Sequence, residues 1–114
     1  MMELADISRL SRLVDAEWRC PAADVLAARW GHDEGAARWW RSSASHVFVI
    51  PGGSASGGAR HLRFVPEWSR VFGRFEWIAA ITDALHGRGL AVAAPAPSLR
   101  GRLVETADTV LGQH

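Results

Sequence analysis

Hydrophobic positions change their spacing along this chain, and the changes divide it into helices and strands. Apolar residues recur every three or four positions over residues 6–18 and again over residues 21–30, as expected for two short amphipathic helices. Asp6 is a candidate cap for the first helix, Pro21 suits the first turn of the second, and Gly31 can end it. The sequence therefore predicts two helices before any strand.

A pattern typical of strands begins at Trp39 and Trp40. Residues 46–50 are apolar at odd and even positions alike, which indicates a strand that is buried on both faces. The glycine- and serine-rich residues 51–58 lack the spacing of the common phosphate-binding loops and predict a flexible connection. We expect this connection to join the strand to an antiparallel neighbour at residues 59–65.

A longer amphipathic helix is predicted over residues 69–86, and two further strands over 90–94 and 103–106. The apolar face of this helix, expected to pack on the sheet, consists of Val71, Phe72, Phe75, Ile78, Ala79, Thr82 and Leu85. The order of elements favours an α+β fold: an antiparallel sheet of about five strands with one packed helix, preceded by two N-terminal helices. Residues 1–35 form the N-terminal helical segment and 36–114 the sheet and helix, within one structural domain.

Composition narrows the class of protein. A chain of 114 residues has the usual size of one domain, and its 48% hydrophobic and 22% charged residues are typical of a soluble globular protein. It has neither an apolar run of about 20 residues nor a leader, so we expect a cytoplasmic protein with no membrane partner. The single cysteine, Cys20, excludes a disulfide framework and is expected to be a small buried residue. No metal site is expected.

The charged residues argue against a nucleic-acid partner. The net charge is +1, and the thirteen basic residues are spread along the chain without a dense cluster. All thirteen are arginine, which excludes any phosphate loop that depends on lysine. Any phosphate contact must therefore come from arginine, from backbone N–H groups or from a metal ion.

The six tryptophans offer a possible stacking platform for bases or sugars. The helical phases of Trp18 and Trp30, however, favour burial in the core. Trp68 and Trp77 lie off the main apolar stripe, so they are the tryptophans expected at an exposed surface or a partner interface.

Arg63 and Glu76 are the candidate site residues that the pattern singles out. Strand alternation places Arg63 and His61 on the face opposite Leu62 and Phe64, so Arg63 can project into a cleft. A helix glutamate that holds an arginine keeps its planar guanidinium oriented toward a second anion, such as a nucleotide phosphate. An ordinary ion pair remains the alternative from these residues alone.

Several segments, taken in order, resemble a known family. Residues 43–49, 61–64, Glu76, 89–95 and 103–106 together resemble the N-terminal lobe of the aminoglycoside phosphotransferase family, which are kinase-like small-molecule phosphotransferases. The likeness covers roughly residues 36 to 112. It implies an antiparallel sheet with one helix and a nucleotide bound between this lobe and a larger helical lobe.

The resemblance also implies roles for individual residues. Residues 42–45 would form the loop over the phosphates, Arg63 would contact the phosphates, and a helix glutamate would hold it. The implied nucleotide-binding residues are Arg63, Glu76, Ser43, Ser45, Glu105 and Thr106, the last two at the hinge beside the adenine. ATP and magnesium are the implied cofactors. His46 stands where an asparagine is common in the family.

The catalytic part of such an enzyme is missing from the sequence. Phosphoryl transfer needs an aspartate to orient the acceptor hydroxyl and side chains to hold magnesium. The H-G-D-x-x-x-x-N motif that supplies them in the family does not occur. We therefore expect no catalytic residues, and an ATP-binding lobe that is a fragment or one half of a split kinase, with a companion lobe or a second copy as partner. The alternatives are a non-catalytic protein-interaction module with the same fold and an unrelated helix-and-sheet domain.

Overall fold

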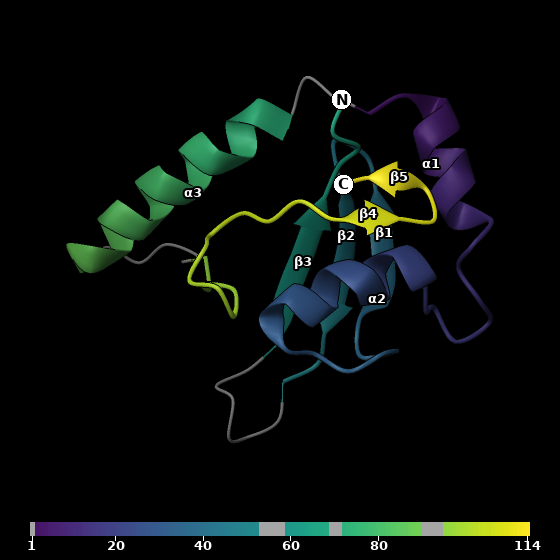
Figure 1. Cartoon of the computed structure of the whole chain (residues 1–114), viewed down its shortest axis with the longest axis horizontal. Helices are drawn as coiled ribbons and strands as arrows, with labels where there is room; N and C mark the ends of the chain where they lie inside the picture. The colour runs from purple at the N-terminus through teal and green to yellow at the C-terminus, as the bar shows by residue number, and fades with distance from the viewer. Residues whose placement is uncertain (1, 53–58, 69–71, 90–94) are drawn as a thin grey trace.

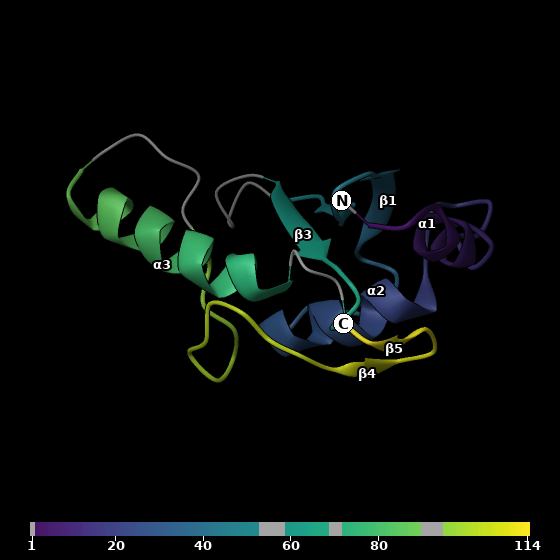
Figure 2. The ribbon, with the colours of Figure 1, turned by 90° about the horizontal axis from the view of Figure 1, so that it is seen from above.

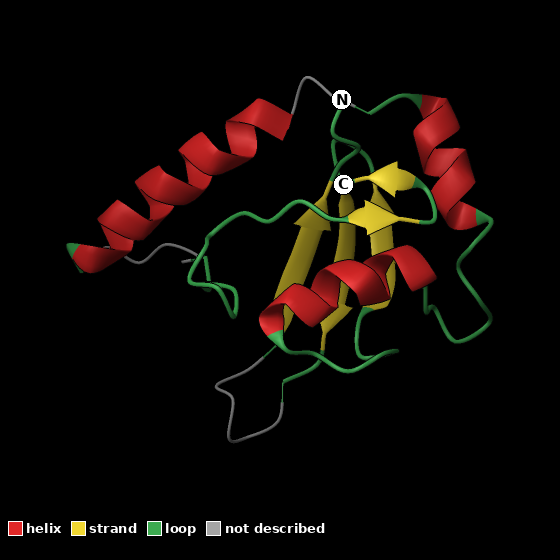
Figure 3. Ribbon diagram, viewed as in Figure 1, coloured by secondary structure: helices red, strands yellow, loops and turns green. Residues whose placement is uncertain are grey.

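A computed structural model describes residues 2–52, 59–68, 72–89 and 95–114, and it confirms the α+β class. Figures 1 and 3 show helices at the sides and front of a small antiparallel sheet. The elements are α1 (Leu4–Ser11), α2 (Pro21–Ala27), a 3₁₀ helix η1 (Ala28–Trp30), β1 (Arg38–Ser42), β2 (His46–Ile50), β3 (Arg60–Phe64), α3 (Phe72–Gly87), β4 (Asp108–Thr109) and β5 (Gly112–Gln113).

The main sheet has three antiparallel strands in the order β1-β2-β3. Its central strand β2 has the predicted bounds, and residues of both parities are buried along nearly its whole length, which confirms the predicted burial of this strand. The pairing of β1 with β2 shifts register between Trp39 and Arg41, so Trp40 is the extra residue of a β-bulge. A separate two-stranded sheet, β4-β5, lies near the C-terminus.

Helix α2 closes the hydrophobic core. Figure 2 shows α2 and the β4-β5 hairpin on one side of the three-stranded sheet, with none of the described helices on the other side. Burial of this apolar surface stabilises the fold by about 25 cal/mol per Å². The core residues from α1, α2 and the sheet include Leu10, Ala22, Ala23, Leu26, Ala27, Phe48, Ile50, Leu62 and Phe64. The N-terminal helical segment therefore shares one core with the sheet.

The first helix is shorter than its periodicity predicted, because a polar turn replaces its second half. The Asp15 carboxylate accepts hydrogen bonds from the backbone N–H groups of Glu17 and Arg19, both at 2.9 Å. Such side-chain bonds compete with helical ones. Trp18 consequently has a φ of 66° and is 56% exposed, stacked on Trp39, so the prediction that Trp18 lies in the core is wrong.

Helix α3 differs most from the expected packing. Phe75, Ala79, Thr82 and Leu85, on the predicted apolar face, are half-buried, yet no described α3 side chain belongs to the core. Trp77 is 68% exposed, and Ile78 and Ile81 are exposed as well. The helix is apolar on several sides, so its pattern does not select one face for packing. Residues 69–71 of the predicted helix lie outside the described residues.

The two predicted C-terminal strands also differ from the structure. Residues 90–94 lie outside the described residues, and residues 103–106 form no strand. A polar loop closes on itself there: the backbone N–H of Ser98 donates to the carbonyl of Arg102 at 2.7 Å, and the Ser98 hydroxyl accepts from the N–H of Arg102 at 3.2 Å. Residues 103–106 follow this loop as irregular chain. No helix among the described residues is long and apolar enough to cross a membrane.

Candidate functional site

The face of the main sheet opposite α2 presents basic side chains. Residues paired across antiparallel strands point to the same side, so the register assigns each side chain to one face. We call the side away from α2 the open face. Its members by register are Arg38, Arg41, Val47, Val49, His61 and Arg63.

Trp40, the bulge residue, also lies on the open face. Its ring centroid is 5.7 Å from that of His61 on β3, and the Arg41 guanidinium carbon lies 4.9 Å from the Trp40 centroid. To meet His61, the indole must reach from β1 across β2. Val47 of β2 is only 3% exposed, although none of the described helices lies on this side of the sheet (Figure 2). Trp40 itself remains 54% exposed, so the indole is an accessible aromatic surface.

The open face has positive charge without matching carboxylates. The three strands contain four arginines and no aspartate or glutamate. Among the described residues, Arg41 and Arg63 form no ion pair, whereas Arg38 donates hydrogen bonds to the backbone carbonyls of Gly35 and Glu17. Guanidinium groups bind carboxylates and phosphates through charge-assisted hydrogen bonds, so the exposed Arg41 and Arg63 are candidate contacts for an anion.

The hairpin between β1 and β2 lies at one end of this face. Arg41, Val47 and Arg63 form one row across the sheet, and the next pair toward the hairpin is Ser42 with His46. The backbone N–H of Ser43 donates to the Ser45 carbonyl at 3.1 Å and closes the turn. Three of the predicted nucleotide-binding residues, Ser43, Ser45 and Arg63, therefore lie at the same end of the sheet.

His46 anchors this hairpin from the core side. Its Nδ1 is 2.8 Å from the Ser42 hydroxyl, which accepts a hydrogen bond from Trp39 Nε1 at 3.1 Å. The imidazole is fully buried, and its Nε2 atom has no hydrogen-bond partner among the described residues. Burial, followed by repulsion from His114, lowers the pKa of His46 to about 4. The ring is therefore neutral at pH 7 and positions the hairpin instead of facing a ligand.

Glu76 and Thr106 lie elsewhere, in a cavity between α3 and the chain that leads to β4. The cavity has a volume of about 390 Å³. Its lining residues are Glu76, Arg102, Leu103, Val104 and Thr106. Among the described residues no ion pair joins Glu76 to Arg63, because α3 borders residues 102–106 instead of packing on β3. The structure thus groups the predicted residues into two places.

Glu105 has a structural role in this arrangement. The Ser98 hydroxyl donates to Glu105 Oε1 at 2.7 Å, and both Nε and Nη2 of Arg100 donate to the carboxylate. The hydrogen bond from Arg100 has the largest effect and that from Ser98 adds to it, and together they lower the pKa of Glu105 to about 2. The buried carboxylate holds the loop over residues 98–105 together. A hinge role for its backbone stays a prediction.

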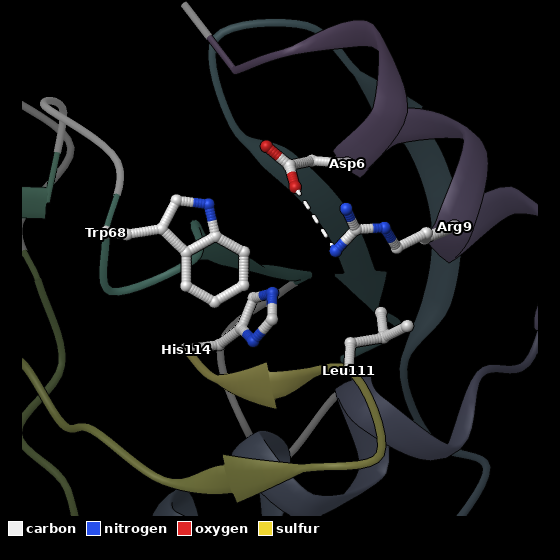
Figure 4. A pocket seen from close by; sticks show the side chains of 5 residues that line it. All are labelled: Asp6, Arg9, Trp68, Leu111 and His114. Carbon is white, nitrogen blue, oxygen red and sulfur yellow. Dashed lines mark ion pairs between the residues drawn. The ribbon is translucent and has the colours of Figure 1, made fainter.

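A second, much smaller pocket lies where α1 meets the C-terminal hairpin (Figure 4). Its volume is about 10 Å³, which is room for a single water molecule. Asp6 and Arg9 lie 4.0 Å apart in it, and Trp68 meets His114 edge-on at 6.0 Å between ring centroids. This pocket is too small for a nucleotide or a sugar.

Comparisons with protein-family models, with curated proteins and with solved structures found no match. Within the described part of the chain, no three histidine, cysteine, aspartate or glutamate residues are placed to hold a metal ion. The strongest candidate site is therefore the open face. Sequence alternation found Arg63 and His61 on it, but the bulge that brings Trp40 and Arg41 beside them leaves no mark in the sequence pattern.

Proposed function

We propose that this chain is the ATP-binding lobe of a small-molecule phosphotransferase, and that the nucleotide binds on the open face. The observation that carries the proposal is the placement of Arg63 and Arg41 beside the exposed Trp40 and the hairpin of residues 43–45, with no carboxylate partner for either arginine among the described residues. The family resemblance assigns phosphate contacts to the same arginine and the same hairpin.

The open face offers groups that complement the phosphates of a nucleotide. Guanidinium groups bind phosphate through paired, charge-assisted hydrogen bonds, and Arg63 and Arg41 present two of them in one row. The Ser43 N–H closes the turn, so the backbone N–H of the exposed Ala44 is the one of the two that can add a neutral donor. The lobe binds the nucleotide, and the companion lobe provides the acceptor site and the catalytic base.

Magnesium and Glu76 enter this proposal differently from ATP. The described residues offer no set of three metal ligands, so the nucleotide phosphates and the companion lobe would hold the ion. Glu76 lines the cavity beside Thr106, and among the described residues it forms no ion pair with Arg63. In the isolated lobe we therefore expect weak ATP binding, because half of the site belongs to the companion lobe.

Calorimetric titration with ATP tests the proposal. Replacing Arg63 by alanine removes a charged hydrogen-bond donor and should weaken binding about 10- to 100-fold. Arg12→Ala is the matched control, because Arg12 is an exposed arginine at the end of α1, outside the open face. Equal weakening by both variants, or no heat at millimolar ATP, would contradict the proposal.

A second candidate function, protein association, is favoured by α3. Trp77, Ile78 and Ile81 expose a contiguous apolar surface on one side of the helix. The occupant we propose is a second copy of the chain, since α3 carries Arg74 together with Glu76 and Asp83 and so offers charges of both signs to another α3. Light scattering should show a dimer that Ile81→Lys converts to monomer; a monomer at all concentrations would refute this function.

A further inference from the structure

We infer that the open face binds single-stranded nucleic acid, with an unpaired base stacked on Trp40 and the backbone phosphates bound by Arg41 and Arg63. The inference uses the face described above and does not depend on the phosphotransferase assignment. The ligand chemistry is that of a strand: phosphates joined at regular intervals, each next to a planar base.

The fold brings together arginines that are far apart in the sequence. Arg41 and Arg63 lie 22 positions apart in the chain, and their register places them in one row, on the two edge strands of the sheet. Strand spacing puts their Cα atoms about 10 Å apart. Arg38 lies on the same face by register, opposite Val49. A chain with a net charge of +1 thus gains a local surface without any strand carboxylate.

Trp40 gives this surface a stacking platform. The indole reaches across β2 toward His61, and the Arg41 guanidinium lies 4.9 Å from the centre of the ring. Every base has a π-face, so an exposed tryptophan on a basic sheet binds unpaired bases without selecting one sequence. Sheets that bind RNA use aromatic side chains on their open face in the same way.

The combination of guanidinium groups with an exposed indole favours a nucleic-acid strand over an acidic protein as the ligand. An acidic peptide would satisfy the guanidinium groups but would leave the indole without a planar partner. Paired duplex bases are closed to stacking, so the strand must be single. The exposed length of each strand, five residues at about 3.3 Å per residue, gives room for a few nucleotides.

Fluorescence anisotropy with a labelled thymidine octamer tests the inference. The wild-type chain should bind the octamer, and Trp40→Leu should weaken binding by 5-fold or more, since base stacking on an aromatic side chain is worth about 1–3 kcal/mol. Trp40→Phe keeps an aromatic ring over Val47 and should retain most of the affinity. It also controls for loss of folding in the leucine variant.

The salt dependence gives a second readout. Each phosphate contact to a single strand contributes about 0.7 to the slope of log K against log salt, so the double variant Arg41→Gln/Arg63→Gln should reduce the slope by about 1.4. Arg12→Gln, remote from the face, should leave affinity and slope unchanged. Equal binding by wild type and the double variant, or by wild type and Trp40→Leu, would overturn the inference.

The outcomes also separate this inference from the proposed function. Binding of the octamer without binding of ATP supports the inference that the open face binds single-stranded nucleic acid and refutes the proposal that the chain is an ATP-binding lobe. Binding of ATP with no binding of the octamer at micromolar protein refutes the inference about nucleic acid and does not contradict the proposed ATP-binding lobe. Displacement of the octamer by inorganic tripolyphosphate at an equal concentration of phosphate groups would show charge attraction alone, and would overturn the role of Trp40.

Discussion

Acidification should destabilise this protein through His46, and replacement of that residue should remove the effect. The imidazole is fully buried between Phe64 and His114, and its Nε2 atom has no partner that would stabilise a proton. Its pKa falls from the usual 6.5 to about 4 in the folded protein. In the unfolded chain the same group titrates normally.

The sign and size of the effect follow from proton linkage. Above pH 6.5 His46 is neutral in both states, so it contributes no pH dependence. Between pH 6.5 and about 4 the unfolded chain binds a proton that the folded protein excludes, so the free energy of unfolding falls as the pH falls. At about 1.4 kcal/mol per pKa unit, the loss approaches 3 kcal/mol near pH 4. His114, whose pKa burial also lowers, adds to it in the same direction.

Urea denaturation at several pH values between 4 and 8 measures this loss. His46→Phe should flatten most of the decline, because the side chain no longer titrates. His46→Gln is a second variant, since it keeps a polar partner for Ser42 without the larger phenyl ring. If the wild type and both variants lose stability in parallel over this range, the buried neutral imidazole is not the cause.

Three further changes test the fold. Leu62→Ala should cost about 2–5 kcal/mol of stability, and Arg63→Ala should cost less than about 0.5 kcal/mol, because Leu62 faces the core and Arg63 faces the open face. Similar losses of stability for both variants in thermal denaturation would mean that the two faces are misassigned. Glu105→Gln should lower the thermal midpoint at pH 7 and weaken the decline in stability between pH 4.5 and about 2. Arg100 and Ser98 hold the pKa of Glu105 low, and the stabilisation they provide is lost as the carboxylate protonates. An unchanged decline in stability at acidic pH would show that the loop does not need this charge. Gly31→Ala should lower the free energy of unfolding in urea by about 1–2 kcal/mol, because Gly31 has a φ of 82° and an added Cβ would lie 3.3 Å from Leu99 Cδ2. An unchanged free energy of unfolding would mean that η1 ends differently.

Local patterns predicted the parts of the fold that depend on neighbours in the chain. The apolar run 46–50 gave β2 its bounds, Pro21 marked the start of α2, and Gly31 adopts the left-handed conformation that ends η1. Each of these depends on backbone geometry or on burial within a few residues. The alternation that put Arg63 and His61 opposite Leu62 is local in the same sense.

Long-range choices were not predictable in this way. Which helix covers the sheet depends on the fit of whole surfaces: the small side chains of α2, Ala22, Ala23 and Ala27, allow close approach to Phe48, whereas α3 is apolar on several sides. The bulge at Trp40 depends on the pairing of β1 with β2, so alternation from Trp39 alone would assign Arg41 to the wrong side. The cavity that unites Glu76 with Thr106 likewise depends on the path of the loop over residues 98–105.

The central claim is that the open face binds the phosphates of a nucleotide. Its most direct test is a calorimetric titration of the wild-type chain, Arg63→Ala and Arg12→Ala with ATP under one set of conditions. We predict binding that Arg63→Ala weakens about 10-fold or more and that Arg12→Ala leaves unchanged. Absence of ATP binding by the folded wild-type chain, or binding that is indifferent to Arg63, would contradict the claim.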